Sequence, residues 1–114
     1  MDMMEKRMSD DCCKIDEKRY SKLFKAFGDK SRLRIIAIVA DNELTVNEIT
    51  EKIGLSQPTV SRHLAILKEA GIVSDRREKQ RVFYALNKES VQACCLGFCN
   101  CLEIEGVTRK SKKD

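Results

Sequence analysis

Two closely spaced helix starts constrain the fold of this chain more than any other feature. Thr45-Val46-Asn47-Glu48 has the capping-box pattern, in which the threonine side chain accepts from the glutamate amide and the glutamate reaches back. Ser56, with Pro58 in the following first turn, marks a second start eleven residues later. Gly54-Leu55 separates the two, and Gly71 supplies a left-handed ending. The spacing predicts two short helices joined by a tight turn.

The rest of the chain predicts a mainly α fold with a small β-hairpin. Apolar residues at helical spacing indicate a first helix over roughly 16–27, and Asp29 is placed to cap a second. Short apolar runs predict two strands on either side of a charged turn, Asp75–Arg81. Asn87 is placed to cap a last helix. The predicted order is α-α-α-α-β-β-α.

Size and composition fit one small domain. The chain has 114 residues, of which 42% are hydrophobic and 35% charged, and this balance argues against disorder. So small a domain buries only about 60–70% of its unfolded surface, which favours a dimer. We expect a flexible segment with a cysteine pair over 1–15, a folded domain over 16–105 and a basic tail over 106–114. The charged start lacks the apolar run of a signal peptide, and the longest uncharged stretch, Ser90–Leu102, has 13 residues, so we expect a cytoplasmic protein without a membrane partner.

The second helix of the closely spaced pair opens with hydrogen-bonding side chains. Such a pair is the helix-turn-helix arrangement, whose second helix lies in the DNA major groove. The expected contacts on this helix are Ser56, Gln57, Thr59, Ser61, Arg62 and His63. The hairpin tip adds backbone contacts from Arg76, Arg77, Lys79, Gln80 and Arg81. Each residue alone fits a cap or a solvated charge, but residues 56–81 hold six basic and three acidic side chains, and their order favours a double-stranded DNA partner.

The longest run of these features resembles a known family. The segment from Leu44 to Leu86 reads LTVNEITEKIGLSQPTVSRHLAILKEAGIVSDRREKQRVFYAL, and Lys25 to Val39 reads KAFGDKSRLRIIAIV. Both resemble the winged helix-turn-helix core of the ArsR/SmtB family of bacterial metalloregulatory repressors. The resemblance implies a homodimer joined through its first and last helices, which represses an operator until an inducer binds. The family often has glycine where this chain has Lys79, which predicts a longer or differently wound wing turn.

Six cysteines in a protein expected to be cytoplasmic favour ligands or redox groups over structural disulfides. Family members that sense cadmium and lead have two thiols where this chain has Thr45 and Asn47, and the zinc-type site needs a histidine beyond His63. The remaining thiols, Cys94, Cys95, Cys99 and Cys101, suit thiophilic ions. Cys94-Cys95 with Cys101 resembles the triad of some arsenite-responsive members. We therefore expect arsenite or antimonite as inducer, with cadmium as another thiophilic candidate and no organic cofactor.

Helix geometry limits which cysteines can share an ion. Cys95 and Cys99 lie one turn apart on one face. Cys94 and Cys101 are seven residues, ~10 Å, apart on a continuous helix. They can reach one ion only if the helix ends between them, and Gly97 and Asn100 predict such an ending. Alternatively, Cys12 or Cys13 crosses the dimer interface as an accessory ligand.

Three other functions are alternatives to a metalloid-responsive repressor. The same thiols in the same fold are consistent with a repressor that senses oxidants or persulfides. A structural zinc site on a DNA-binding protein is a second alternative. An enzyme is a poor fit, because the sequence has neither a C-x-x-C after a predicted strand nor a phosphate-binding loop. We therefore expect no enzymatic activity.

Overall fold

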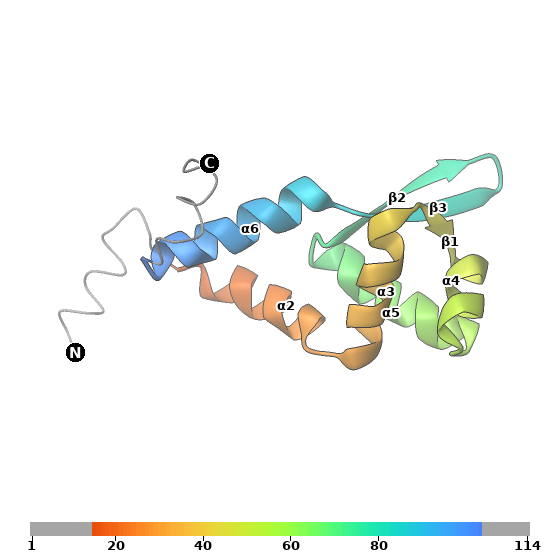
Figure 1. Ribbon diagram of the computed structural model, residues 1–114, viewed down its shortest axis with the longest axis horizontal. Helices are drawn as coiled ribbons and strands as arrows, with labels where there is room; N and C mark the ends of the chain where they lie inside the picture. The colour runs from red at the N-terminus through yellow and green to blue at the C-terminus, as the bar shows by residue number, and fades with distance from the viewer. Residues whose placement is uncertain (1–14, 104–114) are drawn as a thin grey trace.

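The computed structural model describes residues 15–103 (Figure 1). The expected cysteine pair at 12–13 and the basic tail over 106–114 lie outside the described residues. The elements are α2 (Glu17–Phe27), α3 (Lys30–Asp41), β1 (Leu44–Thr45), α4 (Val46–Ile53), α5 (Gln57–Glu69), β2 (Val73–Glu78), β3 (Arg81–Leu86) and α6 (Lys88–Cys101). The predicted mainly α class with a hairpin is confirmed.

Local capping chemistry sets where the helices begin. The four predicted caps, Asp29, Thr45, Ser56 and Asn87, all accept the expected backbone hydrogen bond. Asp16 caps α2 in the same way. Thr45 and Glu48 form both bonds of the capping box, at 3.2 and 2.9 Å. Gly54 and Gly71 have φ of 77° and 81°, where only glycine avoids a steric cost. Gly54 ends α4, and Gly71 directly follows the last residue of the α5 cap, as predicted.

The sheet differs from the prediction in two ways. It has three strands in the order β1-β3-β2, and the short strand β1 was not predicted. The charged stretch Asp75–Arg81 is not a long turn, because β2 and β3 pair as far as Glu78 and Arg81. Nearly all of β2 is exposed, so it lacks the apolar alternation that marks a strand in a sequence. Of the two alternatives for the wing turn, the longer turn is wrong, since Glu78 pairs with Arg81 and Lys79 itself adopts φ 61° between them.

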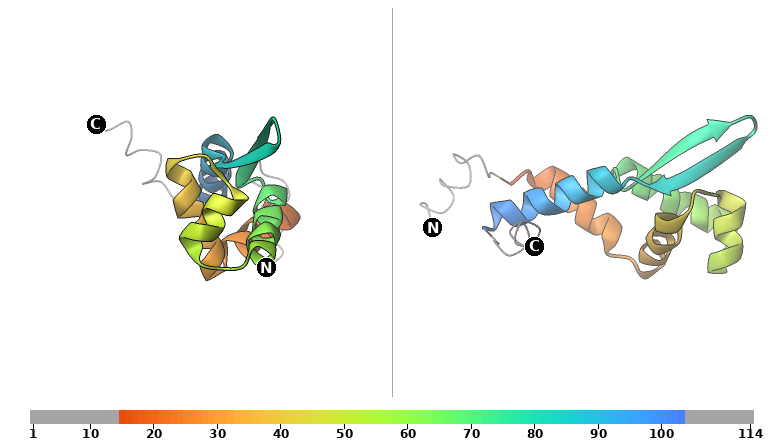
Figure 2. Two further views of the ribbon diagram at one scale, coloured as in Figure 1. Left: turned by 90° about the vertical axis from the view of Figure 1, so that its right-hand side faces the viewer. Right: turned by 45° about the horizontal axis from the view of Figure 1, so that its top comes forward.

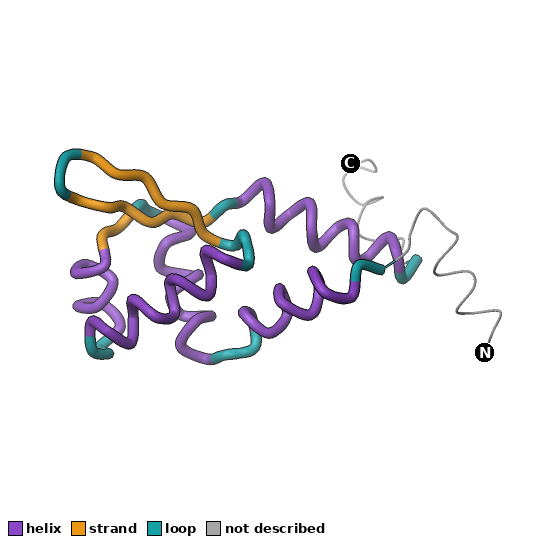
Figure 3. Tube along the Cα trace, turned by 180° about the vertical axis from the view of Figure 1, so that it is seen from behind, coloured by secondary structure: helices purple, strands orange, loops and turns teal. Residues whose placement is uncertain are grey.

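The described residues form two parts, which Figures 1, 2 and 3 show from several sides. The part that we call the core lobe comprises α3, α4, α5 and the sheet. Its buried apolar side chains are Ile35, Val39, Ile49, Ile53, Val60, Leu64, Leu67, Ile72 and Val73. The part that we call the arm comprises α2 and α6, which meet at the end away from the lobe and spread apart toward it. In the arm, only Leu23, Ala26 and Cys94 are buried among the described residues.

Helix α6 is continuous from Lys88 to Cys101, so the predicted ending near Gly97 and Asn100 is wrong. Gly97 serves close packing instead, because a Cβ at this position would lie 3.1 Å from the Tyr20 hydroxyl oxygen. Phe98 packs on Tyr20 and Phe24, with ring centroids 5.1 and 4.9 Å apart. These contacts hold α6 along α2. Among the described helices, none combines the length and the apolar character needed to cross a membrane.

Candidate functional site

The α4–turn–α5 unit presents the polar start of α5 to solvent. The Ser56 hydroxyl caps α5 and lies 2.8 Å from the Thr59 hydroxyl, so these two side chains are tied into the first helical turn. Gln57, Ser61 and Arg62 are exposed. On the other side of the helix, its apolar residues enter the core. The arrangement fixes α5 on the lobe and leaves the three exposed side chains available to base edges or phosphates.

His63 does not belong to this exposed surface, which corrects the prediction. Its side chain is only 15% exposed and faces α3. Nδ1 lies 3.2 Å from Nη1 of Arg32, and Nε2 lies 4.0 Å from a carboxylate oxygen of Asp29. Because a guanidinium only donates hydrogen bonds, Nδ1 accepts, and the ring proton of the neutral histidine is on Nε2. His63 therefore connects α5 to the start of α3.

Arg32 is the centre of this connection, and the sequence analysis missed it. Its guanidinium also donates to the carbonyl of Ala26, at 2.9 Å, and to that of Lys25, at 3.2 Å. One side chain thus joins the end of α2, the start of α3 and the middle of α5. The hydrogen bond from the backbone amide of Arg32, together with the positive charge of the Arg32 side chain, lowers the pKa of the Asp29 carboxyl. The only sequence signal was an arginine three residues after a helix cap, which is too common to be diagnostic.

The hairpin carries the basic wing, but one of its arginines is already paired. The Arg76 guanidinium donates two hydrogen bonds to the Glu43 carboxylate, at 2.9 and 2.8 Å, and a third hydrogen bond to Glu78, at 2.9 Å. The bond from Arg76 lowers the pKa of the Glu43 carboxyl. The guanidinium carbons of Arg76 and Arg81 lie 4.8 and 5.3 Å from the centre of the Phe83 ring. Arg77, Lys79 and Gln80 are exposed at the hairpin end.

The α6 cysteines lie in different environments. Cys94 is 6% exposed and accepts a hydrogen bond from Nη2 of Arg19, at 2.9 Å. Cys95 is exposed, whereas Cys99 and Cys101 are half-buried. Since α6 is unbroken, Cys94 and Cys101 are separated by ~10 Å along its axis, while Cys95 and Cys99 follow one another by one turn. Within residues 15–103, no three His, Cys, Asp or Glu side chains are grouped closely enough to hold a metal.

One phenol and one thiol of the arm have a pKa above the ordinary value. Burial raises the pKa of Tyr20, and Cys101 adds to this effect. Partial desolvation, with the neighbouring Cys94 and Cys99, raises the pKa of the Cys95 thiol. Binding of a thiophilic ion to Cys95 must therefore displace a proton.

Comparison with known proteins identifies the family. The family model for bacterial regulatory proteins of the arsR family matches residues 29–75. Over 92% of this chain and all of the other, the structure of reduced HlyU from Vibrio cholerae superposes with a TM-score of 0.62 at 33% identity. The chain belongs to the ArsR family. The match covers α3, α4, α5 and the start of β2, which are the elements that carry the helix-turn-helix.

The curated relatives that this chain matches are transcriptional regulators, not enzymes. The transcriptional activator HlyU of Vibrio cholerae is 44% identical over 62% of this chain and 66% of its own length. The arsenic resistance transcriptional regulator ArsR1 of Pseudomonas putida is 48% identical over 61% of this chain and 56% of its own. The chain thus aligns with little more than half of the Pseudomonas protein. A homodimeric winged helix-turn-helix DNA-binding domain from Mycobacterium bovis, 28% identical, covers 77% of this chain and 83% of its own, with a TM-score of 0.63. The winged helix-turn-helix fold is therefore confirmed.

Proposed function

We propose that this ArsR-family regulator is a repressor that binds operator DNA as a homodimer and is released by arsenite or antimonite. The observation that carries the DNA-binding part is the exposed, capped start of α5, on the same core lobe as a basic hairpin. Gln57, Ser61 and Arg62 read base edges or phosphates in the major groove. Ser56 and Thr59 hold the helix start, whose backbone amides favour a phosphate. Arg77, Lys79 and Arg81 follow the DNA backbone from the wing, with Arg76 when it leaves Glu43.

The dimer forms through the arm. Phe24, one of the rings that join α2 to α6, is 44% exposed, and Leu102, whose amide donates to the Phe98 carbonyl, is 49% exposed. An apolar strip of this kind on so small a domain is costly to leave in water. A second arm packed against it places two α5 helices for successive major grooves of a near-palindromic operator. The homodimeric Mycobacterium bovis domain supports this arrangement.

The inducer binds to the cysteines of α6. Cys95 and Cys99, one turn apart and accessible, form the chelating pair. The third sulfur comes from Cys94 or Cys101 after local rearrangement, or from Cys12 or Cys13, which lie outside the described residues. Arsenous acid exchanges its three hydroxyl groups for three cysteine sulfurs, and each hydroxyl leaves as water with the proton of one thiol. The arsenic resistance regulator of Pseudomonas putida supports this choice of ion.

Because α6 belongs to the arm, a ligand on it changes the angle between the two core lobes. A coupling of ~2–3 kcal/mol lowers DNA affinity about 30–150-fold, which is enough to switch a gene.

The test is operator binding by fluorescence anisotropy, with the reduced full chain, its own upstream DNA and fixed salt. Arsenite at a few equivalents should release the DNA, and Cys95→Ser with Cys99→Ser should abolish the response while leaving DNA binding intact. Cadmium, zinc and peroxide are titrated in parallel. Release by peroxide alone would replace the metalloid with a redox signal, and a protein that binds no upstream DNA would overturn the repressor itself.

A further inference from the structure

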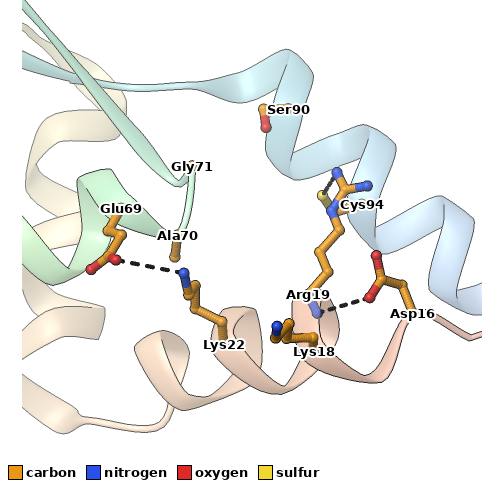
Figure 4. Close-up of a pocket in the computed structure, with 9 residues that line it drawn as sticks. All are labelled: Asp16, Lys18, Arg19, Lys22, Glu69, Ala70, Gly71, Ser90 and Cys94. Carbon is orange, nitrogen blue, oxygen red and sulfur yellow. Dashed lines mark hydrogen bonds and ion pairs between the residues drawn. The ribbon is translucent and has the colours of Figure 1, made fainter.

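A cavity of about 350 Å³ lies between the arm and the core lobe, on the side of α6 that faces α2 (Figure 4). Helix α2 forms one wall, the turn between α5 and β2 forms the second, and α6 forms the third. Its volume is at the lower end of the ~300–1,000 Å³ found for small-molecule sites. The DNA-binding proposal does not use this space, and the chelating pair of the metalloid proposal, Cys95 and Cys99, does not line it.

The cavity brings a thiol together with an arginine. The sulfur of Cys94 forms part of the wall, and Nη2 of Arg19 donates to it at 2.9 Å. Figure 4 shows the Arg19 side chain reaching from α2 to this sulfur. The Ser90 hydroxyl lies one turn earlier on α6, in the same wall. Cys94 is the one thiol among the cavity-lining residues, whereas the chelating pair Cys95 and Cys99 does not line the cavity.

The charges around the cavity match a ligand with both signs of charge and an excess of negative charge. Lys18, Arg19 and Lys22 provide three cations from one face of α2, against two carboxylates, Asp16 and Glu69. Lys22 reaches Glu69 across the cavity at 3.6 Å, and both side chains are more than half exposed, so a ligand can exchange with this weak pair. Small peptide-like molecules with two or more carboxylates and one ammonium group per unit have this distribution.

We propose that this cavity binds a small anionic disulfide of the glutathione type and that Cys94 reacts with it. The Cys94 thiolate attacks one sulfur of the ligand, a new S–S bond forms at Cys94, and the ligand's own S–S bond breaks. Half of the ligand leaves as a thiolate and takes the proton that Cys94 gave up. Cys94 is oxidised and the departing half is reduced, so the ligand itself is the oxidant.

Arg19 controls access to this reaction. Its guanidinium donates to the sulfur of Cys94, a residue that is 6% exposed with the arginine in place, and it must turn from the sulfur to a ligand carboxylate as the disulfide enters. The retained half of the ligand then occupies the space between α2 and α6. The adduct forms in a cavity that neither Cys95 nor Cys99 lines, and its formation does not depend on arsenite or DNA.

The test compares two disulfides of opposite charge on the reduced full chain. Oxidised glutathione carries carboxylates and cystamine carries only ammonium groups, and intact-protein and peptide mass spectrometry report the rate and the position of the adduct. Modification of Cys94 should be about tenfold faster with oxidised glutathione, because the cations of α2 concentrate the anion. Equal rates, or first modification at Cys95, Cys99 or Cys101, would overturn the proposal.

Variants separate the cavity from general surface charge. Lys18→Gln with Lys22→Gln should slow the reaction of oxidised glutathione severalfold and leave that of cystamine unchanged or faster. Lys25→Gln with Lys30→Gln removes the same charge from exposed positions outside the cavity and should leave both rates as in the parent chain. An equal slowing by both pairs would contradict a built site. Since the adduct is mapped on the parent chain, the result does not require a Cys94 variant to fold, and failure of operator binding would leave it unaffected.

Discussion

The core lobe and the arm differ in how far the same chain covers their apolar side chains. In the lobe, Ile35, Ile49 and Val60 are fully buried by α3, α4, α5 and the sheet of the same chain. In the arm, Phe24 and Leu102 remain about half exposed. The lobe thus has its own core, whereas the arm has an apolar surface that a second arm would cover. Folding of the first should be independent of protein concentration, and order in the second should depend on it.

The largest expected effect breaks the lobe. Leu64→Ala should lower the free energy of unfolding by about 2–5 kcal/mol, because the leucine is 1% exposed and the lobe cannot close the cavity fully. Urea unfolding at several protein concentrations measures the loss, which should be the same at each. Ile66→Ala is the control on the same helix, since Ile66 is 37% exposed and should cost far less. Equal costs would mean that the lobe lacks the tight core described here.

The second prediction concerns the joint between arm and lobe. Arg32→Met should cost about 2–3 kcal/mol of stability, because it leaves His63 and the carbonyls of Ala26 and Lys25 without a charged donor. Operator affinity should fall as well, since α5 loses its tie to α3. The matched control is Arg34→Met, an exposed position on α3. Unfolding and anisotropy measurements in which the two variants behave alike would remove Arg32 as a positioning residue for α5.

The third prediction tests the difference between the two parts directly. Leu102→Lys and Leu33→Lys make the same change at positions 49% and 50% exposed, one in the arm and one in the lobe. Sedimentation should show that Leu102→Lys raises the dimer dissociation constant about 10–100-fold, in line with the ~1.5–3 kcal/mol of a buried leucine. Leu33→Lys should leave it unchanged. The reverse result would place the dimer interface on α3.

Whether the sequence predicts a contact depends on how far apart the two interacting residues are along the chain. The caps at Asp29, Thr45, Ser56 and Asn87 involve partners three residues away, so the residue pattern was sufficient. The pairs that connect the parts are remote along the chain. Arg19 and Cys94 are 75 residues apart, and Arg32 and His63 are 31 apart. No local pattern encodes such pairs.

The same reason explains the errors. Strand β1 exists only because Leu44 and Thr45 pair with β3, nearly forty residues later. The charged half of β2 is a strand because β3 supplies its hydrogen bonds and Phe83 packs on Arg76 and Arg81. Gly97 predicted a helix ending because a glycine weakens a helix, yet here its missing side chain admits the Tyr20 hydroxyl. Each of these three features depends on a partner element.

The smallest expected effect concerns the wing. Glu43→Gln should free Arg76 from its strongest partner and let it contact a DNA phosphate. Operator affinity should rise, and the slope of log affinity against log salt should steepen by about 0.9 for the added phosphate contact. Glu89→Gln, which removes the same charge from the exposed first turn of α6, should leave the slope unchanged. A slope that is unaltered in Glu43→Gln would mean that Arg76 stays on the protein when DNA is bound.

The Glu43–Arg76 pair also predicts a pH dependence. The pKa of Glu43 is lowered in the folded chain by the hydrogen bond from Arg76, so the pair stabilises the wing above the unfolded pKa of ~4.3. This stabilisation disappears as the pH falls through the lower, folded value. Both side chains are about half exposed, so the effect is small and is best seen as a difference between the parent chain and Glu43→Gln. Between pH 6 and 8 the difference in stability should be constant, and it should shrink below pH 4. A difference that grows as the pH falls would contradict an ionised Glu43 held by Arg76.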